Sequence, residues 1–110
     1  MKTNELTGAA LDWAVAKCEY DELSMKVIQH PAYAGKFPIP RPSTSWLQGG
    51  PIIEREGIGI ERFDGRWLAS YDLSTETSWG ATGPTPLIAA MRCYVASKLG
   101  DDIDIPKELT

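Results

Sequence analysis

Histidine and cysteine are scarce in this chain of 110 residues, which has one histidine and two cysteines. A zinc site needs several such ligands at suitable spacing, and a Ser–His or Cys–His site would have to use His30, which precedes a proline in an ordinary loop. Zinc and nucleophilic chemistry are therefore not expected, and no cofactor is predicted. Cys18 and Cys93 stand among apolar helical residues and are expected to be packed thiols rather than a disulfide.

Long apolar runs and surplus positive charge are also missing. No stretch reaches the length of about 18 apolar residues that a membrane span needs, and residues 1–7 lack an apolar run behind a basic head. A formal net charge of −4 disfavours a broad nucleic-acid surface. We therefore expect a soluble, cytoplasmic, non-enzymatic protein with no membrane partner, and nucleic acid is disfavoured as a partner.

What is present predicts one domain over residues 1–110. Two helices are expected, over residues 7–19 with Thr7 as N-cap and over residues 86–99 between the Thr85 cap and Gly100. The first helix should turn Leu11, Ala14, Val15 and Cys18 toward the core, with Asp12 and Lys17 off that face.

Three strands are predicted between and beside these helices. Residues 24–29 alternate as a short strand, and residues 58–63 and 66–71 flank Asp64-Gly65, a strong hairpin signal. The intervening segments are predicted as a proline-rich loop (31–42), two short turns (43–50 and 51–57), a polar loop (72–83) and a frayed acidic tail (101–110). The fold class is therefore α+β, a small three-stranded antiparallel sheet packed with two main helices, similar to an α-β-α sandwich.

Three blocks of this sequence, residues 6–17, 43–56 and 83–92, resemble the NinX-like proteins of tailed bacteriophages and prophages. The resemblance extends over nearly the whole chain. It implies an accessory protein of a phage, expressed inside a bacterial cell, with an α-β-α sandwich type of domain. The family supplies no catalytic residue and no assigned activity.

The start of the last predicted helix is one candidate ligand site. Its first turn has unpaired N–H groups and a partial positive charge, which suit an anion. Thr82 and Thr85 offer hydroxyl groups, Gly83 permits close approach of the backbone, and the guanidinium of Arg92 can reach back toward the helix start. The alternative is an ordinary capped helix with Arg92 in solvent.

A second group of candidates lies in two loops. Ser43, Thr44 and Ser45 could contact polar edges of a ligand beside Trp46, and Trp79 could form a second aromatic wall. The alternative is that the tryptophans fill the core. The carboxylate pairs Glu19/Asp21 and Glu54/Glu56 could hold a metal, but such pairs usually face solvent, and no metal site is predicted.

Two functions from different classes follow from these features. The first is a binder of a small anionic, nucleotide-like ligand, which would sequester a bacterial immune signal. The second is a protein–protein adaptor that binds a host or phage enzyme through the proline-rich loop, with Tyr33 and Phe37 as anchors. A homodimer with a shared pocket is compatible with either function.

Overall fold

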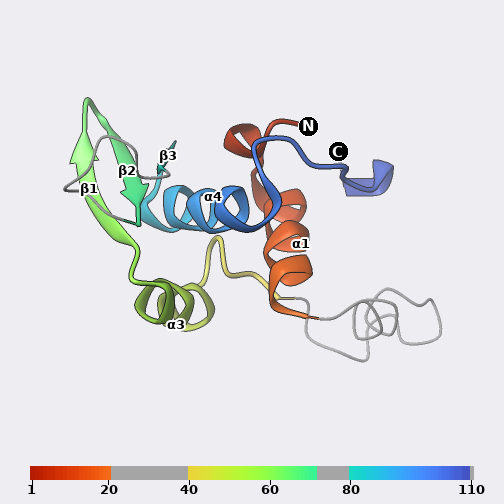
Figure 1. Ribbon diagram of the computed structural model, residues 1–110, viewed down its shortest axis with the longest axis horizontal. Coiled ribbons are helices and arrows are strands. Elements are labelled where there is room, and N and C mark those ends of the chain that lie inside the picture. The colour runs from red at the N-terminus through yellow and green to blue at the C-terminus, as the bar shows by residue number, and fades with distance from the viewer. Residues whose placement is uncertain (21–39, 72–79, 110) are drawn as a thin grey trace.

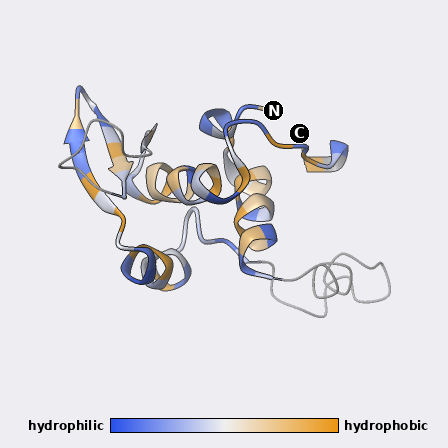
Figure 2. Ribbon diagram, viewed as in Figure 1, coloured by the Kyte–Doolittle hydropathy of each residue, from blue (hydrophilic) through white to orange (hydrophobic). Residues whose placement is uncertain are grey.

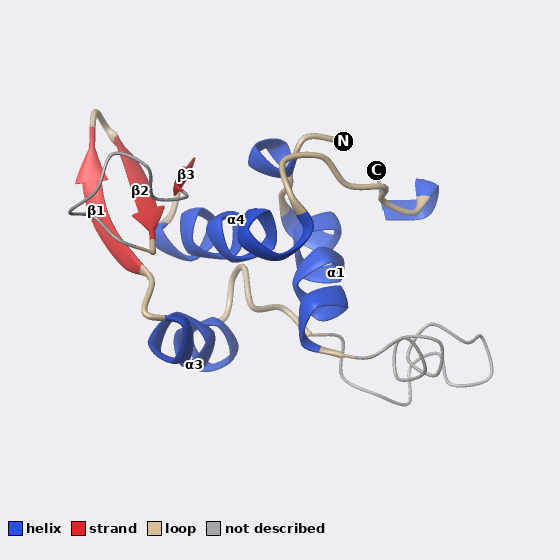
Figure 3. Cartoon of the chain, viewed as in Figure 1, coloured by secondary structure: helices blue, strands red, loops and turns tan. Residues whose placement is uncertain are grey.

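The computed structural model describes residues 1–20, 40–71 and 80–109. In this part of the chain three α-helices accompany one antiparallel sheet of three strands, which confirms the predicted α+β class (Figure 3). The elements in chain order are η1 (Thr3–Glu5), α1 (Gly8–Glu19), α3 (Trp46–Glu56), β1 (Gly59–Phe63), β2 (Arg66–Ser70), β3 (Gly80–Gly83), α4 (Pro86–Leu99) and η3 (Lys107–Leu109).

Helix α4 is the central element of the fold (Figure 1). It contacts all three strands, and it also contacts α1, α3 and η1. An apolar sequence with no distinct polar face is typical of a helix that is buried on all sides. Its predicted ends are confirmed, because the Thr85 hydroxyl accepts a hydrogen bond of 3.1 Å from the Ile88 amide and the helix ends at Gly100 with a φ of 90°.

The hairpin is confirmed, but the third strand comes from an unexpected segment. Asp64 and Gly65 both have positive φ angles, 50° and 78°, as a tight two-residue turn requires. Strand β3 pairs with β2 and arises from the stretch predicted to be a polar loop, so that prediction is wrong for Gly80–Gly83. Small residues make this strand possible, because a Cβ at Gly83 would lie 2.9 Å from the Ala89 nitrogen. The predicted strand 24–29 lies outside the described residues.

One helix replaces the two predicted short turns. Helix α3 continues through Pro51 and ends, as predicted, at Gly57 with a φ of 71°. Proline inside a helix removes one backbone hydrogen bond. Packing outweighs that loss: Ile52 is buried, and Gly49 lies so close to the Pro42 carbonyl that an added Cβ would be 2.5 Å from its oxygen.

Helix α1 has the predicted bounds and core face, but two local predictions are wrong. The Thr7 side chain makes no capping hydrogen bond. Asp12, expected off the core face, is buried. Its carboxylate accepts a hydrogen bond of 2.9 Å from the Ser43 amide, which offsets part of the cost of its burial. In Figure 2 apolar colours extend along α4 and much of α1, whereas α3 has a hydrophilic side.

The acidic C-terminal segment is not frayed where it meets the N-terminus. Lys2 and Asp102 form an antiparallel bridge, the Ile103 amide donates to the Met1 carbonyl at 3.0 Å, and Ile103 is buried. The two ends of the chain lie on the same side of the molecule (Figure 1). This contact brings η1 and Asp101 to the C-terminal half of α4, where they form one wall of a pocket.

Candidate functional site

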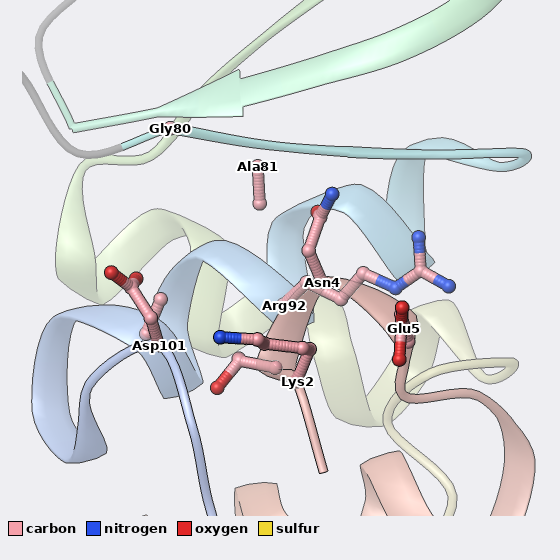
Figure 4. Close-up of a pocket in the computed structure, with 9 residues that line it drawn as sticks. Lys2, Asn4, Glu5, Gly80, Ala81, Arg92 and Asp101 are labelled. Carbon is pink, nitrogen blue, oxygen red and sulfur yellow. The ribbon is translucent and has the colours of Figure 1, made fainter.

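A pocket of about 310 Å³ lies between η1, β3 and α4 (Figure 4). This volume is at the lower end of the range for small-molecule sites. The described residues of its lining combine four charged side chains with an amide and small residues: Lys2, Thr3, Asn4, Glu5, Gly80, Ala81, Arg92, Ala96 and Asp101. Among the described residues of the lining there is no aromatic ring, so these residues offer no surface on which a base would stack.

The backbone of Thr82 organises the polar wall of this pocket. In the described part of the chain β3 pairs with β2 alone, so the other edge of β3 needs partners for its backbone groups. The Thr82 amide donates to Asn4 Oδ1 at 3.3 Å, and the Thr82 carbonyl accepts from Arg92 Nη1 at 2.8 Å. Two side chains from η1 and α4 therefore replace a neighbouring strand.

Arg92 is the most unusual charge in the fold. It is only 5 % exposed, and its Nε donates to the Leu6 carbonyl at 2.9 Å. Within the described residues no carboxylate lies within 4.0 Å of its guanidinium. Burial, and then the charge of Arg66, lower the pKa of Arg92. Among the described residues the guanidinium is therefore held by two carbonyl oxygens, and no carboxylate of these residues compensates its positive charge.

The other charged side chains of the described lining are more exposed than Arg92, and none of them forms an ion pair with it. The Lys2 side chain is 67 % exposed and lies 3.9 Å from Asp102. The Thr3 hydroxyl donates to the Gly100 carbonyl at 2.7 Å, which fixes η1 on the end of α4. Figure 4 shows Asp101 at the end of the lining opposite the Arg92 guanidinium.

Four of the sequence-predicted site residues, Thr82, Gly83, Thr85 and Arg92, lie near one another at β3 and α4. The two threonines do not line the pocket. Thr82 acts through its backbone, and the Thr85 hydroxyl is occupied by the Ile88 amide. Gly83 is buried against α4. Arg92 is the member of this group that lines the pocket, and its side chain reaches back toward Thr82 as expected.

The Ser43–Trp46 group lies elsewhere and does not line the pocket. Ser43 is buried, and its Oγ has no hydrogen-bond partner within the described residues. Thr44 is exposed, Ser45 precedes α3 without a side-chain cap, and Trp46 is 56 % exposed. A Cβ at Gly49 would lie 2.7 Å from Leu87 Cδ2, which is where α3 meets α4. Trp79 lies outside the described residues.

A second polar cluster joins three helices and was missed by sequence reasoning. Arg55 of α3 donates to both carboxylate oxygens of Glu19 at 3.0 and 2.8 Å, and Tyr94 donates to Glu19 at 2.6 Å. Arg55 also pairs with Glu56, which accepts from Tyr71 at 3.1 Å. Glu19 and Arg55 are 36 positions apart, so no local spacing predicts their pairing.

The pKa values in this cluster follow from its hydrogen bonds. The bond from Arg55, followed by that from Tyr94, lowers the pKa of Glu19 against the opposing effect of burial. Burial, assisted by Glu56, raises the pKa of Tyr71 to about 12. Each charged side chain of the cluster has a partner of opposite charge. We therefore interpret the cluster as a structural contact that stabilises the packing of α3 on α1 and α4.

The remaining candidate chemistry finds little support in the described residues. Cys18 is half-buried and Cys93 is buried; they form no disulfide, and burial raises the pKa of each to about 11. In residues 1–20, 40–71 and 80–109 no three His, Cys, Asp or Glu side chains gather as metal ligands. None of the helices in these ranges combines the length and apolarity needed to cross a bilayer.

Comparison with known proteins adds a family to this geometry. No curated protein matches the chain. The family model described as bacteriophage P22 NinX matches residues 2–98, which include η1, all three strands and α4 up to Lys98. Because this match extends over most of the chain, the protein belongs to the phage P22 NinX family.

Proposed function

We propose that this NinX-family protein binds a small anionic, nucleotide-like ligand without turnover, and that it does so in the pocket beside Arg92. The observation that carries the proposal is the burial of Arg92 with no carboxylate partner among the described residues. In the setting of a phage accessory protein, such binding would sequester a bacterial signalling nucleotide.

The energetics of Arg92 support an anionic ligand. Removing a guanidinium from water is costly unless its charge is matched and its N–H groups are bonded. The carbonyl groups of Leu6 and Thr82 satisfy two of its donors but supply no full negative charge. An anion that enters the pocket would supply that charge, and the low exposure of Arg92 would limit screening of the contact.

The lining supports binding rather than catalysis. Among the described lining residues the hydroxyl group of Thr3 is engaged by the Gly100 carbonyl, and none of these residues is a histidine or a cysteine. The lining carboxylates Glu5 and Asp101 could act as bases, but the hydroxyl group that they could activate among the described lining residues is that of Thr3, which is already engaged. The pocket therefore offers contacts for an anion more clearly than a reacting set.

Isothermal titration calorimetry against nucleoside monophosphates, cyclic nucleotides and ADP-ribose-type nucleotides tests the proposal. We expect saturable binding to the wild-type protein and its loss in Arg92→Met, which keeps much of the side-chain volume but removes the charge. Arg62→Met is the matched control, because Arg62 is exposed on β1 and does not line the pocket. Circular dichroism verifies that each variant is folded. Absence of heat with every nucleotide would contradict the proposal.

A protein–protein adaptor is the second candidate function. Trp46 and Leu47 are 56 % and 87 % exposed at the start of α3, and exposed tryptophan is enriched at protein interfaces. Tyr33 and Phe37, the anchors proposed in the proline-rich loop, lie outside the described residues. Pull-down from infected cells tests this candidate. A stable partner that is lost when Tyr33 and Phe37 become Ala, with nucleotide binding unchanged, would favour the adaptor.

A further inference from the structure

We infer that Asn4 and Arg92 form a two-donor seat for one terminal phosphate group, and that the preferred ligands are phosphate monoesters of hydroxylated compounds such as sugars. This inference rests on the proposed function and names the ligand class for the same pocket. It adds Asn4, a residue that the sequence did not single out.

The orientation of the Asn4 amide follows from one hydrogen bond. The backbone N–H of Thr82 can only donate, so the atom it contacts at 3.3 Å is the carbonyl oxygen Oδ1 of Asn4. The amino group Nδ2, with its two N–H donors, is consequently not used in the contact with the Thr82 amide. Asn4 lines the pocket, and no described residue accepts a hydrogen bond from this amino group.

Arg92 lies beside this amide because both side chains bind the same residue. Arg92 Nη1 donates to the carbonyl of Thr82, whose amide is bound by Asn4. The two N–H-bearing groups are thereby held at adjacent positions on one strand edge (Figure 4). The planar guanidinium of arginine forms charge-assisted hydrogen bonds with phosphate oxygens, and a neutral amide donor adds a contact with no further charge.

The carboxylates among the described lining residues disfavour a second phosphate, and the remaining cation, Lys2, is 67 % exposed and lies 3.9 Å from Asp102. Glu5 and Asp101 carry negative charge at the pocket and would repel a second phosphate group. Their carboxylate oxygens accept hydrogen bonds from hydroxyl groups, as a sugar provides. The volume of about 310 Å³ also favours a small ligand.

The Asn4→Asp variant distinguishes phosphate binding by the Asn4 amino group from the structural contact that Asn4 makes with the Thr82 amide. The new carboxylate can still accept from the Thr82 amide, but it no longer donates, and it places a negative charge beside Arg92. We therefore expect the variant to unfold at a higher temperature than the wild type and to bind ribose 5-phosphate roughly 10- to 100-fold more weakly. Gln48→Glu is the matched control, because the exposed Gln48 likewise accepts from a backbone amide, that of Arg41, but lies on α3.

Calorimetry with ribose 5-phosphate, inorganic phosphate and ribose provides the readout. The inference predicts that ribose 5-phosphate binds most tightly, phosphate binds more weakly, ribose gives no measurable heat, and Gln48→Glu behaves as wild type. Equal binding of ribose 5-phosphate to Asn4→Asp and wild type would overturn the inference. If nucleotides bind but ribose 5-phosphate does not compete with them, the seat is wrong and the proposed function stands. If no nucleotide or phosphate ester binds, both fail.

Discussion

Arg92 in α4 donates a hydrogen bond of 2.8 Å to the carbonyl oxygen of Thr82 in β3. This bond joins the central helix to the open edge of the sheet, and it also fixes the one buried guanidinium in the described residues at the wall of a pocket. The same contact therefore contributes to the fold and positions the charge that we propose for ligand binding.

Replacement of Arg92 by Lys should destabilise the protein. A single ammonium group cannot reproduce the two bonds to the Leu6 and Thr82 carbonyls, so one buried carbonyl would lose its partner. We expect the free energy of unfolding in urea to fall by about 1–3 kcal/mol. Arg62→Lys, at an exposed position, should change it by less than about 0.5 kcal/mol. Similar values for the two variants would contradict the structural role given to Arg92.

Neighbouring glycines in α3 should respond in opposite directions to alanine. A Cβ at Gly49 would lie 2.5 Å from the Pro42 oxygen, whereas a Cβ at Gly50 would meet nothing within 4 Å. Gly49→Ala should lower the free energy of unfolding by about 1–3 kcal/mol. Gly50→Ala should raise it by roughly 0.5–1 kcal/mol, because alanine favours the helix. Denaturant unfolding measures both. A Gly49→Ala variant as stable as the wild type would contradict the close contact between Gly49 and Pro42.

The two threonines at helix starts should differ when each is changed to alanine. The Thr85 hydroxyl caps the Ile88 amide, but the Thr7 side chain makes no such bond. Thr85→Ala should therefore cost about 0.5–2 kcal/mol of stability, and Thr7→Ala should cost less. Thermal unfolding of the two variants side by side provides the measurement. A larger loss for Thr7→Ala would refute the assignment of caps.

Acid sensitivity should depend on Glu19. The hydrogen bond from Arg55 lowers the pKa of this carboxyl in the folded state. A lowered folded pKa means that the stabilising effect is complete above the unfolded value of about 4.3 and is lost as pH falls through the folded pKa. Glu19→Gln should consequently lose less stability between about pH 5 and pH 3 than wild type. Glu61→Gln, on the exposed side of β1, serves as the control. Parallel acid profiles for Glu19→Gln and wild type would exclude this contribution.

The elements with strong local signals were predictable from sequence. Thr85, Pro86 and Gly100 mark both ends of α4, and Asp64-Gly65 specifies the hairpin. The third strand and the continuous α3 were not predictable in this way, because both depend on tertiary packing. Gly83 and Gly49 have weak preferences of their own, and it is contact with α4 and Pro42 that determines their conformation.

The candidate site was only partly visible for the same reason. Arg92 could be singled out as a lone charge in an apolar helix. Asn4 and Asp101 could not, since they reach the pocket through contacts between the chain ends and β3 that join residues about 80 to 100 positions apart. Long-range pairing of this kind leaves no periodic trace in the sequence.

Nuclear magnetic resonance of the arginine side chains tests the central claim most directly. The Nε–H signal of Arg92 in the wild-type protein is followed while ribose 5-phosphate or a binding nucleotide is added, with the signals of Arg55 and Arg62 as internal references. We predict a saturable shift of the Arg92 signal and of the Asn4 amide signal, with little change at Arg55 and Arg62. Saturable shifts confined to the region of Trp46, with Arg92 and Asn4 unchanged, would contradict a ligand site at this pocket.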